Sequence, residues 1–187
     1  LLASSAASDV YKRQVTSLPG PAACITALTL SGLPTRRFAF EAFLPMDKKE
    51  RKEVLEELVN ETRTIILYEA PHKLVRTLRD LRETLGNRRM TLCRELTKKH
   101  ETAFHSTIDD LITHYEKEKP LGECVLVIEG KSRQELKEEA VASWEEISIE
   151  EHMEIYEKQG MSRKDAMKQV AKDRGVSKRD IYSYLMK

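Results

Sequence analysis

The sequence predicts an α/β fold with a mixed sheet, followed by a small helical appendage at its carboxyl end. Between residues 37 and 129, short apolar runs rich in β-branched or aromatic residues alternate with segments whose apolar residues recur at helical spacing. This alternation of strands and helices is typical of an open α/β sheet. After Lys131 the apolar runs stop, and three successive Ser-x-x-acid pairs each predict the start of a short helix.

The stretch TIILYEAPHKL, residues 64–74, is the clearest strand–turn–helix unit. Its first five residues predict a buried strand, and Pro71 suits the first turn of a helix expected over residues 72–85. In open α/β sheets, ligands collect beyond the carboxyl ends of the strands. Tyr68, Glu69 and His72 therefore lie where a small-molecule site is expected, although the same residues also suit a surface turn that faces water.

The remaining elements follow from the same patterns. Further strands are expected at residues 37–44, 89–95, 102–105 and 123–129, of which the third is a short antiparallel strand. Further helices are expected at residues 22–31, at residues 47–61 and from Thr107 onward. Residues 131–143 are expected to form a linker or a loose helix. The last three helices open at the pairs Ser148/Glu151, Ser162/Asp165 and Ser177/Asp180.

Composition narrows the class of protein. The 187 residues are 40% hydrophobic and 34% charged, which suits one domain with an appendage and a soluble surface. No apolar run approaches the length of a membrane span. The three cysteines, Cys24, Cys93 and Cys124, are scattered in apolar contexts and are expected to be buried free thiols. Nucleotide-binding glycine loops, nucleophile elbows and zinc signatures are absent from the sequence, so no metal site is expected.

Charge is uneven near the carboxyl end, although the net charge is only +1. Residues 134–157 hold nine acidic residues against one lysine, whereas residues 162–187 hold eight basic residues against three aspartates. The basic face of the last helices, including Lys164, Lys168 and Arg179, could meet RNA phosphates. Two solvated helices explain the same pattern.

Polar residues also follow the strand expected at residues 89–95. With those after the earlier strand they form one set: Tyr68, Glu69, His72, Lys73, Arg94, Glu95, Thr97, Lys98, Lys99 and His100. Adjacent cations and carboxylates suit a polar, anionic substrate, and a carboxylate or lysine could assist proton removal from a hydroxyl. A structural network of salt bridges accounts for the same residues.

Four segments together resemble one enzyme family. The segments PGPAACITALTLSGLPTRRFAFEAFLP, YEAPHK, RELTKKHE and GECVLVIEG occur in the order found in the ribosomal RNA small-subunit methyltransferase I family. That family is a branch of the tetrapyrrole-methylase-like enzymes that use S-adenosylmethionine. The resemblance runs from about Val15 to Gly130, and the basic tail is also similar to the family's C-terminal extension. It implies 2′-O-methylation of a cytidine in small-subunit ribosomal RNA, free or in the assembled subunit, in the bacterial cytoplasm.

The resemblance also implies roles for particular residues. The cofactor would contact a turn and two strand ends: Pro19, Gly20, Pro21, Ala22, Ala23, Tyr68, Glu69, Ala70, Leu96 and Thr97. The RNA would contact His72, Lys73, Arg94 and Lys99, together with the tail residues named above. Any proton handling would fall to Glu95 or Lys98.

The chain departs from the family at its amino end. Residues 1–14 are expected to be a non-native or unrelated leader, and residues 15–33 a remnant of the N-terminal cofactor domain with its linker. Residues 34–131 would be the C-terminal α/β methyltransferase domain, and residues 132–187 a linker and three-helix basic tail. A chain without the glycine-rich cofactor domain is expected to methylate poorly alone.

Two alternatives remain open: a tetrapyrrole-type small-molecule methylase and a non-catalytic RNA-binding remnant. The family is known for dimers, on which this sequence is silent.

Overall fold

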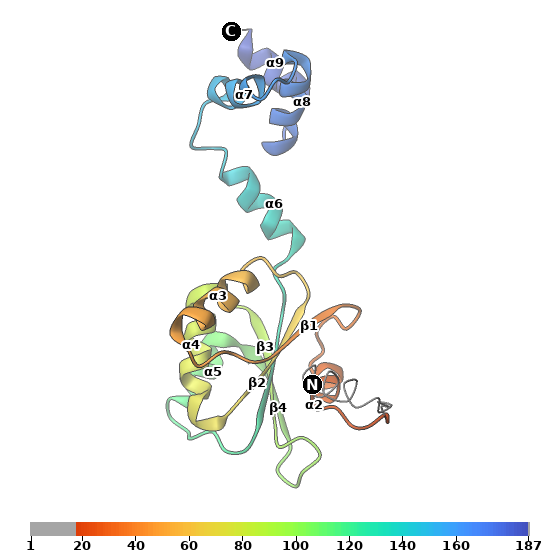
Figure 1. The fold of residues 1–187 in the computed structure, drawn as a ribbon, viewed down its shortest axis with the longest axis vertical. Coiled ribbons are helices and arrows are strands. Elements are labelled where there is room, and N and C mark those ends of the chain that lie inside the picture. Colours follow the sequence, from red (N-terminus) through yellow and green to blue (C-terminus); the bar gives the residue numbers. More distant parts are fainter. Residues whose placement is uncertain (1–17, 187) are drawn as a thin grey trace, which may run out of the picture.

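The computed structural model describes residues 18–186 (Figure 1). The expected leader at residues 1–14 and the first three residues of the segment expected at residues 15–33 lie outside this range. Five strands form one sheet: β1 (Phe38–Phe43), β2 (Thr64–Glu69), β3 (Arg89–Arg94), β4 (Thr102–Thr107) and β5 (Cys124–Ile128). Their order is β1-β2-β5-β3-β4, with β1 parallel to β2 and the other neighbours antiparallel. The mixed α/β sheet predicted from the sequence is therefore confirmed.

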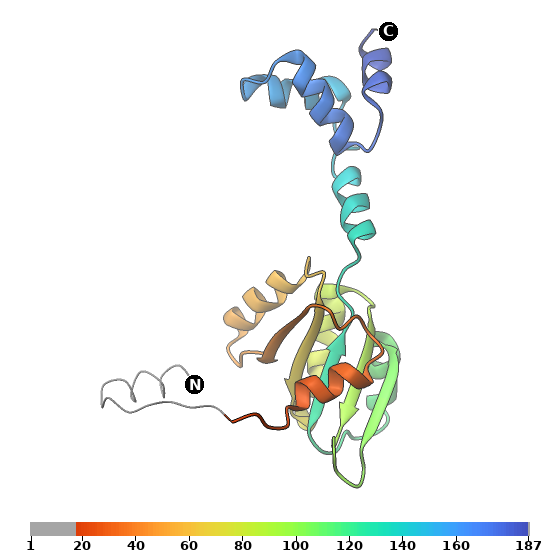
Figure 2. The ribbon, with the colours of Figure 1, turned by 90° about the vertical axis from the view of Figure 1, so that its right-hand side faces the viewer.

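Helices cover both faces of this sheet. The helices α3 (Lys48–Leu58), α4 (Leu74–Leu85) and α5 (Ile108–Tyr115) lie on one face, and α2 (Ala23–Leu30) crosses the other (Figures 1 and 2). Side chains of a strand alternate between faces. On β5, Leu126 and Ile128 pack toward α3–α5, whereas Val125 and Val127 pack toward α2, and all four are buried. Burial on both faces explains the uninterrupted apolar run at this strand.

Local sequence signals set the helix boundaries. Asp47 accepts hydrogen bonds from the backbone N–H groups of Lys49 and Glu50, so α3 begins directly after it. Thr107 caps α5 in the same way through the N–H of Asp110. Pro71 opens a single 3-10 turn, η1 (Pro71–Lys73), and the regular helix α4 begins only after it.

Residues 133–142 form a regular helix, α6 (Arg133–Ala142), where the sequence suggested a linker or a loose helix. Ser132 and Glu135 make a complete capping box at its start, which fixes the first turn. None of its residues is buried, and Figure 1 shows it as a stalk between the sheet and the last three helices.

The appendage consists of α7 (Ile149–Lys158), α8 (Arg163–Asp173) and α9 (Lys178–Leu185), as predicted. Its small core combines aliphatic side chains from all three helices, among them Met153, Val170 and Ile181. His152 is also fully buried, stacked on Trp144 at 3.8 Å between ring centroids. Its Nδ1 accepts a hydrogen bond from Arg174 Nε, and burial lowers the pKa of its imidazole. No helix within residues 18–186 has both the length and the hydropathy needed to cross a bilayer.

Candidate functional site

The ends of β2 and β3 meet at one edge of the sheet. The last residues of these strands, Glu69 and Arg94, are both in register with Cys124, the first residue of the intervening strand β5. Because β5 is antiparallel to both, β2 and β3 run in the same direction and end side by side. The two polar segments that the sequence singles out therefore lie at a common edge.

Tyr68 lies near the end of β2 and packs against α2 on one face of the sheet. Its hydroxyl accepts a hydrogen bond of 3.0 Å from the backbone N–H of Cys24 at the start of α2. Phe40 and Phe43 of β1 contact its ring edge-on, with centroids 5.1 and 5.6 Å away. Leu96 packs into the same apolar cluster. Burial raises the pKa of the Tyr68 phenol, which keeps the hydroxyl neutral.

Glu69 points to the opposite face of the sheet. Its carboxylate accepts hydrogen bonds from the N–H of Ala70 at 2.8 Å and from Thr77 Oγ1 of α4 at 2.5 Å. Thr77 Oγ1 in turn accepts from Arg51 Nη2 of α3. With 6% of its surface exposed, Glu69 ties the strand to the helical layer. The structure therefore separates it from Tyr68, beside which the family resemblance places it.

The loop after β3 has a strained backbone held by an ion pair. Glu95 and Thr97 adopt left-handed conformations, with φ of 50° and 63°, which are uncommon for residues other than glycine. Glu95 Oε1 accepts hydrogen bonds from the N–H of Glu123 at 3.1 Å and from Lys98 Nζ at 3.2 Å. Lys98 also lies 3.2 Å from a carboxylate oxygen of Glu123. Backbone strain of this kind is concentrated at functional sites.

These contacts set the charge states of Glu95 and Lys98. The hydrogen bond from the Glu123 N–H, followed by that from Lys98, lowers the pKa of the Glu95 carboxyl. The hydrogen bonds to Glu95 and Glu123 raise the pKa of the Lys98 amine. At neutral pH the pair is a carboxylate and an ammonium, so only Glu95 can accept a proton.

Replacing Gly122 by alanine is expected to disturb this pair. A Cβ at Gly122 would lie 2.1 Å from Glu95 Oε1, and the backbone there has φ of +76°. The Glu95 side chain must leave its place, so the raised pKa of Lys98 should fall back toward its ordinary value, as measured by NMR titration. Gly160→Ala is the matched control, because Gly160 also has a positive φ of +89° but an added Cβ would meet nothing within 4 Å. Equal effects on Lys98 from both changes would contradict this expectation.

The predicted RNA contacts form two separate groups. His72 and Lys73 lie in η1, and Lys73 Nζ is 2.8 Å from Met46 Sδ. Arg94 is half-buried at the end of β3, where its Nε has no hydrogen-bond partner among the described residues, and Lys99 is exposed in the loop. Lys164, Lys168 and Arg179 are exposed on α8 and α9, beyond the stalk (Figure 1).

The residues predicted for the cofactor are likewise divided. Pro19 to Ala23 are exposed and lead into α2, on the same face as Tyr68 and Leu96. Thr97 lies in the strained loop, and its N–H donates to Glu101 Oε2 at 2.6 Å. Glu69 points to the other face, toward Thr77 of α4. Within residues 18–186, no three metal-ligating side chains gather in one place.

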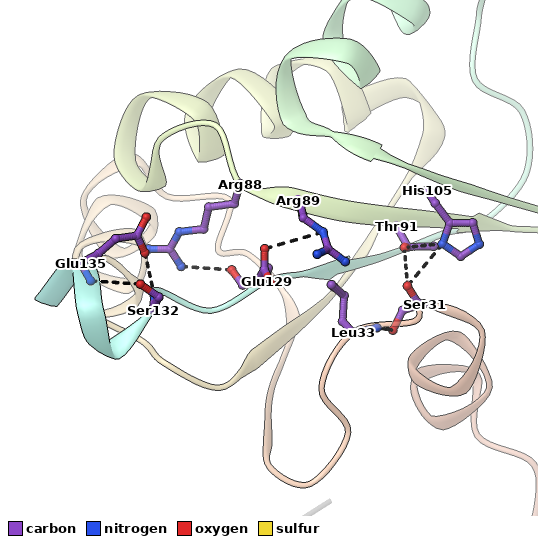
Figure 3. A network of polar contacts seen from close by, with 9 residues as sticks. All are labelled: Ser31, Leu33, Arg88, Arg89, Thr91, His105, Glu129, Ser132 and Glu135. Atoms are coloured by element: carbon purple, nitrogen blue, oxygen red, sulfur yellow. Dashed lines mark hydrogen bonds and ion pairs between the residues drawn. The ribbon is translucent and has the colours of Figure 1, made fainter.

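A polar network that the sequence did not predict lies toward the opposite edge of the sheet, where β3 begins and β5 ends (Figure 3). Arg88 donates hydrogen bonds to the carbonyls of Val59, Leu85 and Glu129. Thr91 Oγ1 donates to the carbonyl of Ser31 at 3.0 Å and lies 3.0 Å from His105 Nδ1. The sequence does contain a signal for this region: an Arg-Arg doublet precedes or begins each of β1 and β3.

Comparisons with known proteins agree with this architecture. The sequence model of the family described as Tetrapyrrole (Corrin/Porphyrin) Methylases matches residues 3–112, beginning within the segment set apart as a leader. The solved structure of a cobalamin biosynthetic enzyme, cobalt precorrin-4 methyltransferase CbiF, superposes with a TM-score of 0.50 at 13% identity. The superposition covers 67% of this chain and 56% of that one, and it supports the fold.

Two curated relatives are similar over most of the chain, and both are called Ribosomal RNA small subunit methyltransferase I. The one from Halalkalibacterium halodurans is 45% identical over 170 residues, which cover 90% of this chain and 58% of the relative. The one from Bacillus subtilis is 43% identical over 168 residues, which cover 90% of this chain and 57% of the relative. The chain thus spans somewhat more than half the length of these relatives.

Proposed function

Because this chain belongs to the family of tetrapyrrole (corrin/porphyrin) methylases, we propose that it forms part of an S-adenosylmethionine-dependent methyltransferase of small-subunit ribosomal RNA. The observation that carries this proposal is the identity of 45% and 43%, over nine-tenths of the chain, to two relatives with that name. The finer assignment is 2′-O-methylation of a cytidine in the cytoplasm, on the free RNA or the assembled subunit. It rests on the motifs quoted from the sequence.

The α2 side of the sheet edge suits the cofactor. Bound S-adenosylmethionine would supply an electrophilic methyl group on a sulfonium. The turn at residues 19–23 leads into the start of α2, whose positive dipole favours a carboxylate. Tyr68 and Leu96 add an apolar wall beside it. These residues form one side of a cleft, and the domains would be those given by the sequence: residues 15–33, 34–131 and 132–187.

The chemistry asks little of the protein beyond alignment. The protein would have to align the ribose hydroxyl with the methyl group of the bound cofactor and provide an acceptor for the hydroxyl proton. Holding the two reactants in line supplies most of the acceleration. We assign proton acceptance to Glu95, because Lys98 is an ammonium held by Glu95 and Glu123. Lys98 then orients the carboxylate.

Basic residues at the sheet edge and on the last helices favour RNA over a small tetrapyrrole as the substrate. His72, Lys73, Arg94 and Lys99 would grip the RNA near the target ribose. Lys164, Lys168 and Arg179 would contact phosphates farther along the strand. A small-molecule methylase of the same fold needs no such spread of basic residues.

Salt dependence of binding tests this choice. We expect a fluorescein-labelled fragment of small-subunit RNA to bind the chain, with an affinity that falls about 1,000-fold between about 50 and 200 mM salt as counterions are released. A free tetrapyrrole should bind weakly. Tight, salt-independent binding of the tetrapyrrole, with no binding of the RNA, would overturn the proposal.

A further inference from the structure

A large hollow of about 1170 Å³ lies at the edge of the sheet opposite the candidate site. It is bordered by the loop before β1, the beginnings of β2 and β3, the residues after β5 and the first turn of α6. The strand β5 leads from one edge to the other, with Cys124 at the candidate site and Ile128 next to the hollow. A strand of about five residues is about 17 Å long, which gives the separation of the two places.

The hollow is strongly cationic. Seven arginine or lysine side chains line it, against three glutamates. Four of the cations are already engaged. Arg63 pairs with Glu61, Lys131 with Glu139, and Arg88 with three backbone carbonyls, while Arg89 lies 3.9 Å from Glu129. Figure 3 shows Arg88 and Arg89 on either side of Glu129.

Three of the arginines, Arg36, Arg37 and Arg133, make no ion pair with any residue in the described part of the chain. All three are exposed. The carboxylates that could neutralise them have other partners: Glu139 binds Lys131, and Glu135 caps α6 through Ser132. The hollow therefore presents uncompensated guanidinium groups from two distant segments of the chain.

We propose that this hollow binds phosphodiester groups of the RNA substrate, several nucleotides away from the methylated ribose. The identity of the polyanion as RNA rests on the proposed function, whereas the preference for phosphate rests on the hollow itself. Guanidinium groups form paired hydrogen bonds to phosphate oxygens, so three unpaired arginines are suited to this ligand. No aromatic side chain is among the described residues that line the hollow, so it offers no surface for base stacking. It holds the backbone without reading the sequence.

The test compares two double variants of the chain that lose the same charge. Arg36→Gln/Arg37→Gln removes two of the unpaired cations of the hollow. Arg79→Gln/Arg82→Gln is the control, because these arginines lie on α4 and pair with Glu116 and Asp109 in the outer helical layer. The affinity for labelled small-subunit RNA is measured by fluorescence anisotropy at several salt concentrations, and thermal melting confirms that each variant is folded. Arg133→Gln, from the other segment, is measured beside them.

The hollow variant should bind about tenfold more weakly, and its plot of log affinity against log salt should be shallower by about 1.4 to 1.8 for two lost contacts. The loss should be the same for an RNA of unrelated sequence and equal length. Arg133→Gln should lower the slope by about half as much, and the control should leave it unchanged.

Equal slopes for the hollow and control variants would overturn the inference and leave the proposed function standing. Failure of the unaltered chain to bind RNA would overturn it as well, and methyl transfer would then decide the proposed function separately.

Discussion

Replacing Gly130 by alanine is expected to lower the free energy of unfolding by about 3 kcal/mol. Gly130 follows β5 and lies directly before the turn into α6. A Cβ there would lie 2.4 Å from the carbonyl carbon of Thr62 and 2.4 Å from the carbonyl oxygen of Arg63. Both are backbone atoms in the segment that enters β2, and the N–H of Lys131 donates a 2.7 Å hydrogen bond to the carbonyl of Glu61 beside them. The added methyl group must push these two segments apart.

Gly20→Ala is the control for this change. An added Cβ at Gly20 would meet nothing within 4 Å, so its effect should stay below about 1 kcal/mol in either direction. Urea unfolding followed by circular dichroism measures both variants. Equal stability of Gly130→Ala and Gly20→Ala would contradict the close contact between residue 130 and the segment that enters β2.

The second large effect is expected at Arg51, whose guanidinium is buried between α3 and α4. Only 8% of Arg51 is exposed. Its Nε lies 2.7 Å from Asp80 Oδ2, and its Nη2 donates to Thr77 Oγ1, which in turn donates to Glu69. Arg51→Leu would leave the Asp80 carboxylate without its cation and Thr77 without one donor. We expect the free energy of unfolding to fall by about 2–3 kcal/mol, because removing one partner of a buried ion pair costs more stability than removing one partner of an exposed pair.

Arg79→Leu separates the effect of burial from that of the contact. Arg79 Nη2 also lies 2.7 Å from a carboxylate oxygen, that of Glu116, but these side chains are 61% and 46% exposed. Exposed pairs contribute little, so this change should cost less than about 0.5 kcal/mol. Similar losses for the two leucine variants in urea unfolding would show that Arg51 is not held in a buried network.

Much of the sheet and its helices could be predicted because the spacing of apolar residues differs clearly between the two. Continuous apolar runs mark the strands, and apolar residues at helical spacing mark the helices. Residues 124–128 are apolar without interruption, and this strand is indeed buried on both faces. For α6 the sequence predicts only a linker or a loose helix, although Ser132 and Glu135 carry the same capping signature that correctly predicts α7, α8 and α9. The segment has no continuous apolar face, so its hydrophobic periodicity does not indicate a helix.

The candidate site was predictable in position but not in orientation. The ends of two strands at one sheet edge follow from the alternation of strands and helices. Tyr68 and Glu69 are neighbours on a strand, so their side chains must point to opposite faces, and only one of them can line a cleft on the α2 side.

The cationic hollow could not be predicted from the sequence, because its parts are far apart in the chain. The hollow brings together Arg36, Arg88 and Arg133 because β5 lies between β2 and β3 and is followed directly by the turn into α6. Their pairing states are equally hidden. Nothing in the sequence tells that Arg88 is held by carbonyls or that Lys131 is paired with Glu139.

Methyl transfer tests the central claim most directly. Residues 18–186 would replace the matching part of the Bacillus subtilis relative, so that the chain is joined to the rest of that protein. The folded chimaera would be incubated with small-subunit RNA and S-adenosylmethionine labelled in its methyl group, with the intact relative as the positive control. We expect label on the ribose 2′-oxygen of a cytidine, and a loss of about 100-fold in rate for Glu95→Gln. A chimaera that folds and binds the cofactor, yet labels a tetrapyrrole and leaves the RNA unlabelled, would contradict the proposed function.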